Sequence, residues 1–263
     1  MNRTDNFSLL GKKALIANPE APYGAQIAEG FCEAGAEVFL CGGDAAKMEA
    51  MAGRFREDGH KVSVLMEYRQ GTEAAAAGLA EAARSKMGRI DSFVYVDPGC
   101  FPKGWDIEFE EISENMQATQ TGLMLTIKNI GSLMAGQGSG AVLFITDYAA
   151  LVGCDVHNYD KAPEIFDEGF SLLYGFLKGG YVNYTRQAAG YLGENGVRCN
   201  CIAYAPLGGG MPDGFEQAFI RYSHLKRMAT EQDVKDVAVF FASDASAYIT
   251  GVTLPVDGGY TSK

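Results

Sequence analysis

The sequence predicts an α/β fold in which one doubly wound parallel sheet of about seven strands carries helices on both faces. Short apolar runs of strand length alternate with longer segments of helical periodicity along all 263 residues. No linker or change of composition divides the chain, so we expect a single domain over residues 1–263. Repeated strand–helix–strand units with right-handed crossovers give the Rossmann-type arrangement.

Each element has its own local signal. In the first predicted helix, Ile27, Phe31 and Ala34 share one face, and Gly35 ends it. Asp44 is the expected N-cap of the second helix. The predicted strands are 13–17, 37–41, 62–66, 93–96, 141–146, 198–203 and 252–256. The other predicted helices are 73–87, 110–134, 171–192 and 231–242.

The composition argues against several classes of protein. A net charge of −11 repels polyanions, so nucleic acid is not an expected partner. No stretch approaches the roughly 20 apolar residues of a membrane helix, and the polar start lacks the features of a secretory signal. The six cysteines form no CxxC pair and the three histidines have no ligand spacing. We therefore expect reduced thiols, a cytoplasmic protein and no metal site.

The C-terminal half carries the most specific motifs. Tyr174-Gly-Phe-Leu-Lys178 opens the second long helix, and Asn200 of the segment NGVRCN follows Lys178 by 22 residues. The segments DVKDVAVFFASD at 233–244 and ITGVTLPVDGG at 249–259 come next. Over essentially the whole chain the sequence resembles the short-chain dehydrogenase/reductase family. A second YxxxK match at 222–226 lacks the downstream spacing.

The resemblance implies four catalytic positions. A Tyr serves as general acid/base, a Lys one turn later lowers the phenol pKa and binds the nicotinamide ribose, a Ser binds the substrate oxygen, and an Asn completes a proton relay. The pKa of a free tyrosine is about 10, so the chemistry depends on lowering it. Tyr174 and Lys178 match the first two positions, but the Ser position falls on Asp147 and the Asn position on Thr119. Asn115, one turn earlier, is a weak substitute.

Asp147 changes the expected chemistry of Tyr174. A carboxylate beside a phenol disfavours the phenolate, because like charges repel. Thr146 is adjacent to Asp147, but alternation along a strand should point it to the other face. We therefore interpret Tyr174 and Lys178 as a catalytic remnant, and a purely structural pair on a long helix stays open as an alternative.

The family's phosphate-binding loop, TGxxxGxG, falls on residues 17–24, where only Gly24 matches. Asn18 and Pro22 replace glycines whose missing Cβ lets the backbone approach a pyrophosphate. Pro19 and Pro22 have no N–H to donate. Glu20 adds a negative charge, which at about 5 Å from a phosphate costs about 3 kcal/mol at an effective dielectric of 20.

The ends of the second and fourth predicted strands also depart from the family pattern, and both changes should weaken cofactor binding. Gly42 and Gly43 stand where an acidic or basic residue normally selects NAD or NADP. Residues 95–98 read YVDP instead of NNAG, which predicts a bulky side chain, the acid Asp97 and a proline against the cofactor. We expect this chain to bind no cofactor, with Asn18, Pro22, Gly24, Gly43 and Asp97 as the degenerate positions. A working enzyme whose loop binds by another route stays open.

An intact scaffold with altered ligand loops is typical of a non-catalytic subunit, or pseudoenzyme. In the family the two long helices and the C-terminal tail pair between subunits, which implies a heterotetramer with a catalytic paralogue that binds NAD. The pattern is similar to the heteromeric dehydrogenases of anaerobic toluene degradation, which act on 2-[hydroxy(phenyl)methyl]succinyl-CoA and in which one subunit type lacks the cofactor motif.

Three further features or alternatives follow from the sequence. The interval between Asp147 and Tyr174 is longer than is usual in the family, and residues 153–169 form an acidic, aromatic insertion beside the cleft. The insertion is a lid, a partner contact or a plain surface loop. The chain is alternatively an active NAD(P)-dependent oxidoreductase that uses Tyr174 and Lys178, or a sensor in which Glu20, Asp97 and Asp147 meet a cationic ligand.

Overall fold

The computed structural model describes residues 3–99, 102, 104–162 and 171–262, and it confirms the doubly wound α/β fold. The described strands form one parallel sheet in the order β3-β2-β1-β4-β5-β6-β7. The order reverses between β1 and β4, which is the switch point where such sheets bind ligands at the carboxyl ends of their strands. The strands are β1 (Lys13–Ala17), β2 (Glu37–Gly42), β3 (Val62–Glu67), β4 (Ser92–Val96), β5 (Gly140–Asp147), β6 (Val197–Tyr204) and β7 (Thr253–Val256).

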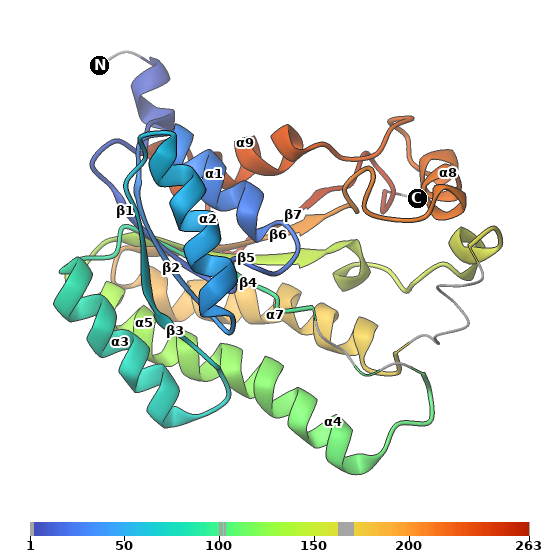
Figure 1. Cartoon of the computed structure of the whole chain (residues 1–263), viewed down its shortest axis with the longest axis horizontal. Coiled ribbons are helices and arrows are strands. Elements are labelled where there is room, and N and C mark those ends of the chain that lie inside the picture. The colour runs from blue at the N-terminus through green and yellow to red at the C-terminus, as the bar shows by residue number, and fades with distance from the viewer. Residues whose placement is uncertain (1–2, 100–101, 103, 163–170, 263) are drawn as a thin grey trace.

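Helices cover both faces of the sheet (Figure 1). One face carries α1 (Gly24–Glu33), α2 (Ala45–Glu57) and α9 (Glu231–Ala242). The other carries α3 (Glu73–Met87), α5 (Gly122–Gln137) and α7 (Tyr174–Gly193), and α4 (Phe109–Met116) precedes α5. Short turns of helix are η1 (Arg3–Phe7), η3 (Tyr148–Ala150), η4 (Val156–Tyr159) and η5 (Asp244–Ser246). None of the helices in the described part of the chain has the length and apolar character needed to span a bilayer.

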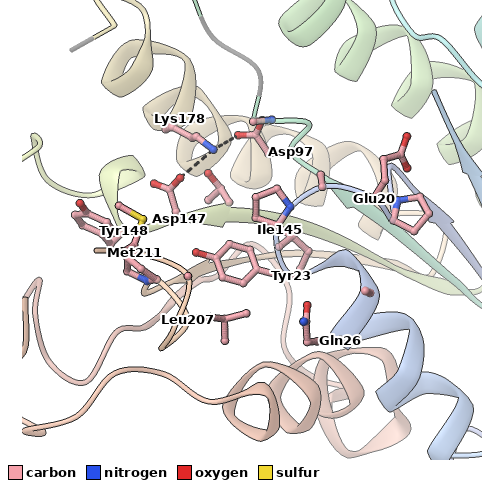
Figure 2. A pocket seen from close by; sticks show the side chains of 18 of the residues that line it. Glu20, Tyr23, Gln26, Asp97, Ile145, Asp147, Tyr148, Lys178, Leu207 and Met211 are labelled. Carbon is pink, nitrogen blue, oxygen red and sulfur yellow. Dashed lines mark hydrogen bonds and ion pairs between the residues drawn. The ribbon is translucent and has the colours of Figure 1, made fainter. Parts of the chain in front are cut away.

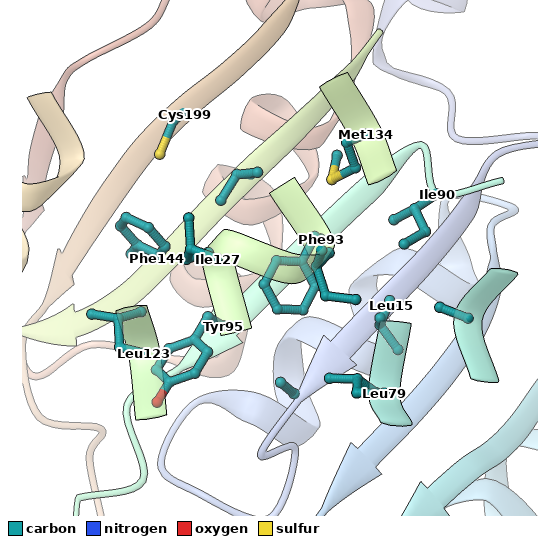
Figure 3. Close-up of a cluster of buried hydrophobic side chains, with 14 of the residues drawn as sticks. Leu15, Leu79, Ile90, Phe93, Tyr95, Leu123, Ile127, Met134, Phe144 and Cys199 are labelled. Carbon is teal, nitrogen blue, oxygen red and sulfur yellow. The ribbon is translucent and has the colours of Figure 1, made fainter. Parts of the chain in front are cut away.

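Two buried layers hold the helices to the sheet. Leu15 and Phe93 point toward α3, α5 and α7 (Figure 3), whereas Ile16 and Val94, one residue later on the same strands, point toward α1, α2 and α9. Successive side chains of a strand alternate between faces, so both faces must be apolar when both are covered. This explains why the strands read as continuous apolar runs in the sequence.

Three elements differ from the sequence predictions. The helix expected over 110–134 is interrupted by a π-helical turn, η2 (Gln117–Thr121), between α4 and α5. The helix expected to begin at residue 171 begins at Tyr174. The sequence analysis missed α8 (Asp213–Tyr222), whose Phe215 and Phe219 are buried in an aromatic cluster with Tyr148 and Tyr260. Phe215 and Phe219 are four residues apart, as expected on one face of a helix, so the sequence did contain a signal for α8 that the prediction missed.

The start of α9 offers a test of local stability. Thr230 and Asp233 form a capping box, and Arg227 pairs with Asp233, whose pKa the Arg227 contact lowers. We expect Asp233→Ala to lower the free energy of unfolding by about 1 kcal/mol, because the Thr230 N–H loses the carboxylate of the capping box and Arg227 loses its partner.

This stabilisation is present above the ordinary carboxyl pKa of about 4 and is lost as pH falls through the lowered value. Urea unfolding at neutral pH and in acid measures both effects. Asp236→Ala, on the exposed side of the same helix, is the matched control. Equal losses in the two variants would contradict the capping role.

Candidate active site

A cleft of about 960 Å³ opens at the carboxyl ends of β1, β4 and β5, at the switch point of the sheet. Most of its wall is apolar, and Figure 2 shows Tyr23, Ile145 and Leu207 around its centre. The polar groups gather at one end, where Figure 2 shows Lys178 between Asp97 and Asp147. A mostly apolar cleft with a few converging polar groups is typical of a small-molecule site.

Lys178 joins two strand ends to α7. Its Nζ lies 2.7 Å from Oδ2 of Asp97, just after β4, and 2.9 Å from Oδ2 of Asp147, at the end of β5. The three side chains are between 4% and 10% exposed. Oδ2 of Asp147 also accepts a hydrogen bond of 2.5 Å from the Tyr174 hydroxyl, and Oδ1 accepts one from Ala149 N. We call these four side chains, Asp97, Asp147, Tyr174 and Lys178, the buried network.

The electrostatics of the buried network favour a neutral Tyr174. Burial raises the pKa of Tyr174 far above its ordinary value, and the Asp147 carboxylate raises it further. For Lys178, burial opposes the charged form, but Asp147 and Asp97 outweigh it and raise the pKa of the ammonium. Burial also raises the pKa of Asp97, and Lys178 opposes that shift.

Of the other predicted catalytic positions, Thr119 is not among the residues that line the cleft. Thr119 is in the π-helical turn, and its hydroxyl donates to the carbonyl oxygen of Asn115 at 2.7 Å. Thr146, expected on the face opposite Asp147, also borders the cleft. The cleft lies beyond the end of β5, so it contacts residues from both faces of that strand.

The loop between β1 and α1 is held by its own side chains. Asn18 has φ of +59°, and its Nδ2 donates to the Val96 carbonyl at 2.8 Å, which ties the end of β1 to the end of β4. Tyr23 has φ of +72°, and its hydroxyl donates to the Ala205 carbonyl at 3.2 Å. Asn adopts the left-handed region more readily than most residues, whereas a bulky Tyr there is rare. Tyr23, which the sequence analysis did not single out, borders the cleft.

Gly24 is required by the shape of this loop. A Cβ at Gly24 would lie 2.6 Å from the carbonyl oxygen of Pro19, so any larger residue would force the loop apart. The one glycine of the family motif that this chain retains thus serves the packing of its own loop.

Glu20 differs from the sequence expectation. The sequence places its charge at the anion site, but the side chain reaches across to the start of α2, where Oε1 accepts from Gly43 N at 2.6 Å and from Asp44 N at 3.3 Å. Glu20 is therefore separate from Asp97 and Asp147 (Figure 2), and the three acids expected to meet a cationic ligand do not form one cluster.

The end of β4 is also only partly as expected. Asp97 borders the cleft, but the bulky Tyr95 does not, because it points into the core beside Tyr181 and donates to Gln70 Oε1 at 2.8 Å. Gln70 Oε1 also accepts from Asn18 Nδ2 at 3.3 Å. Nothing in the sequence around Gln70 indicated this contact, which depends on the neighbouring ends of β1 and β4.

The first part of the insertion packs against the molecule. Asn158 is buried and its Nδ2 donates to the Tyr260 hydroxyl at 2.8 Å, and the Tyr159 ring lies 5.2 Å from that of Phe215. Cys154 and Tyr159 border the cleft. The described part of the insertion thus packs against α8 and contributes Cys154 and Tyr159 to the cleft, and residues 163–169 lie outside the described residues.

The loop between β1 and α1 offers fewer free backbone N–H groups than a glycine-rich phosphate loop. No group of three or more His, Cys, Asp or Glu in the described part of the chain is placed to hold a metal. A pyrophosphate is recognised by backbone N–H groups that glycines leave accessible. Here Pro19 and Pro22 carry no N–H, and the N–H groups of Ala21 and Gly24 donate to carbonyls of the same loop.

The structure thus places Tyr174 and Lys178, one helical turn apart on α7, beside the cleft of a doubly wound α/β protein. Residues 20–261 match the family described as enoyl-(acyl carrier protein) reductase. The chain belongs to this family, which is of the short-chain dehydrogenase/reductase type.

Relatives cover the chain almost from end to end. The cis-4-hydroxycyclohexanecarboxylate dehydrogenase of Sinomonas cyclohexanicum is 27% identical over 95% of this chain and 96% of its own length. The (2S)-[(R)-hydroxy(phenyl)methyl]succinyl-CoA dehydrogenase subunit BbsD of Thauera aromatica is 27% identical over 96% of this chain and 98% of its own. A gluconate 5-dehydrogenase from Burkholderia cenocepacia, solved with NADP and tartrate, is 21% identical and superposes over the full length of both chains with a TM-score of 0.85, which shows the shared fold.

The buried network makes a strong prediction about stability. Lys178→Met leaves Asp97 and Asp147 without their shared cation in a nearly dry site, so we expect the free energy of unfolding to fall by about 3–5 kcal/mol. The loss should shrink in acid: a carboxyl whose pKa is raised by folding stabilises the protein below its unfolded pKa and ceases to do so as pH rises through the folded value.

Urea unfolding of Lys178→Met across neutral and acidic pH measures this effect. Lys128→Met is the matched control, because Lys128 pairs with Glu73 on an exposed surface and should contribute less than about 1 kcal/mol. If Lys178→Met costs no more than the control, the network does not stabilise the cleft as described.

Proposed function

We propose that this chain is the non-catalytic subunit of a heteromeric, NAD-dependent short-chain alcohol dehydrogenase. The observation that carries the proposal is the buried network, in which two carboxylates engage Lys178 and one of them accepts the hydroxyl hydrogen of Tyr174. The family's acid/base chemistry depends on a Tyr whose pKa is lowered by a nearby Lys. Here burial raises the pKa of Tyr174, and Asp147, which contacts both Tyr174 and Lys178, raises it further.

The same network affects the second expected role of Lys178. An ammonium that binds a ribose must have hydrogens to donate to it, whereas this ammonium is almost fully buried between two carboxylates. Breaking a buried ion pair costs free energy, because one charge is left buried without its partner. This cost disfavours any arrangement in which Lys178 leaves Asp97 or Asp147 to bind a ribose. These contacts support a structural role for both Tyr174 and Lys178.

For the partner, we propose a catalytic paralogue in a heterotetramer, with NAD bound by that paralogue. The full-length similarity to BbsD, a protein named as one subunit of a dehydrogenase, supports a heteromeric assembly. Phe109, Met124 and Phe176 are 73%, 49% and 71% exposed on α4, α5 and α7, the layer expected to pair between subunits. The proposed substrate of the complex is a hydroxyacyl-CoA such as 2-[hydroxy(phenyl)methyl]succinyl-CoA.

A second candidate function is an active NAD(P)-dependent oxidoreductase with atypical cofactor binding. One observation favours it: the cleft is large, and both Tyr174 and Lys178 border it. In that case a ligand must displace Asp147 from Tyr174, and nucleotides must bind without the usual loop.

Nucleotide titration of the purified chain separates the two candidates. We expect no binding of NADH or NADPH up to millimolar concentration, because the loop offers few free N–H groups and the cleft carries the carboxylates of Glu20, Asp97 and Asp147. Energy transfer from the exposed Trp105 to the reduced nucleotide reports binding, and calorimetry checks it. Micromolar affinity, or turnover by the isolated chain, would overturn the proposal in favour of the active enzyme.

In the assembled complex, the roles of the two subunits can be compared by the same Tyr→Phe change in each. Tyr174→Phe in this chain should leave kcat and KM of the complex unchanged within about twofold, since a twofold change is only about 0.4 kcal/mol of barrier. The corresponding Tyr→Phe change in the catalytic paralogue should abolish activity and serves as the control. A large loss of kcat from Tyr174→Phe, with the complex still assembled, would assign catalysis to this chain.

A further inference from the structure

The side chain of Glu20 packs against the end of β2. In doubly wound folds the ribose of a bound dinucleotide lies here, and a side chain from the strand end normally recognises it. In this protein the strand ends in Gly42 and is followed by Gly43, and the carboxylate of Glu20, from the loop between β1 and α1, packs against both glycines. We call the space beside these two glycines the ribose corner.

The contacts of Glu20 are close and specific. Oε1 accepts hydrogen bonds from Gly43 N at 2.6 Å and Asp44 N at 3.3 Å, at the start of α2. The carboxylate packs directly on Gly42, where a Cβ would collide with both of its oxygens. Glu20 and Gly42 therefore require each other: the glycine leaves room that the glutamate occupies.

The loop is anchored so that Glu20 reaches this corner. Asn18 is tied to Val96 on one side of Glu20, and Tyr23 is tied to Ala205 on the other. The left-handed conformations of Asn18 and Tyr23 set the path of the loop between these anchors. These two hydrogen bonds and the two left-handed residues therefore all direct the Glu20 side chain toward the end of β2.

We infer that Glu20 is an internal occupant of the ribose corner and that it excludes nucleotides from this chain. The inference rests on the proposed function, because it names the physical cause of the absent cofactor binding. Glu20 acts by volume, since its carboxylate stands where the ribose would lie, and by charge, since a carboxylate repels the phosphates of a nucleotide.

A rival explanation is that Glu20 replaces the missing acidic residue of β2 and accepts ribose hydroxyls itself. The geometry favours exclusion. Oε1 already accepts two backbone hydrogen bonds, and Oε2 is buried, with no hydrogen-bond donor near it among the described residues. In this conformation Oε2 is closed to a ribose, and Oε1 is already engaged by two backbone N–H groups. If Glu20 excludes nucleotides, removing its side chain should strengthen nucleotide binding. If Glu20 accepts ribose hydroxyls, removing it should weaken nucleotide binding.

The test compares wild-type protein with Glu20→Ala, using adenosine, AMP and NADH as probes in calorimetry. Adenosine is neutral and reports the corner alone, whereas AMP and NADH add the phosphates. We expect undetectable binding to the wild type at millimolar adenosine and an affinity at least about tenfold higher for Glu20→Ala. Glu20→Ser is a second variant that empties the corner, in case Glu20→Ala folds poorly.

Two control variants separate the effect of the volume of the Glu20 side chain from that of its charge and from that of removing any nearby carboxylate. Glu20→Gln keeps the size and loses the charge, so it should still exclude adenosine. Glu67→Ala removes an exposed carboxylate at the end of the neighbouring strand β3 and should leave adenosine binding unchanged.

The outcomes are distinct. If Glu20→Ala and Glu20→Ser are folded by circular dichroism but gain no affinity for adenosine, the inference is wrong and the proposed function stands. If the wild type binds NADH at micromolar concentration, the proposed function fails. If Glu20→Ala then also weakens that binding, Glu20 is a ribose acceptor and the inference fails as well.

Discussion

The ion pairs of Lys178 with Asp97 and Asp147 are the interaction on which the cleft depends. They join the ends of two neighbouring strands to the N-terminal part of α7, and all three side chains are nearly buried from solvent. Buried charges must be paired closely or the fold becomes unstable, so these contacts fix where α7 begins. Because Tyr174 is the first residue of that helix, its hydroxyl is brought within hydrogen-bonding distance of Asp147.

The same principle explains the other side of the cleft. The carboxyl edge of a parallel sheet presents backbone groups that a ligand can satisfy, and here side chains of the chain itself do so. Asn18 donates to the end of β4, Glu20 accepts from the start of α2, and Tyr23 donates to a carbonyl after β6. A polar edge that is satisfied internally stabilises the folded chain and lowers the gain from binding a nucleotide.

Tyr148, Tyr159 and Phe215 line the far end of the cleft and pack on a buried cluster of aromatic rings. Tyr148, Phe219 and Tyr260 contact one another, with Phe219 and Tyr260 stacked at 4.2 Å between centroids. The insertion joins this cluster through Tyr159 and its packing on α8. The apolar end of the cleft is therefore shaped by segments that are remote from the phosphate loop, so it can retain its form even though that loop has changed.

The sequence by itself determined the fold, because strands buried on both faces must be apolar throughout and helices must show their own period. It also located Tyr174, Lys178, Asp97 and Asp147, since the motif spacing places them at strand ends and on one helix. Only the tertiary structure decided where Glu20 points, that Tyr95 faces the core, and that Gln70 joins Asn18. Those outcomes depend on which loops meet across the edge of the sheet, and such contacts leave no periodic pattern in the chain.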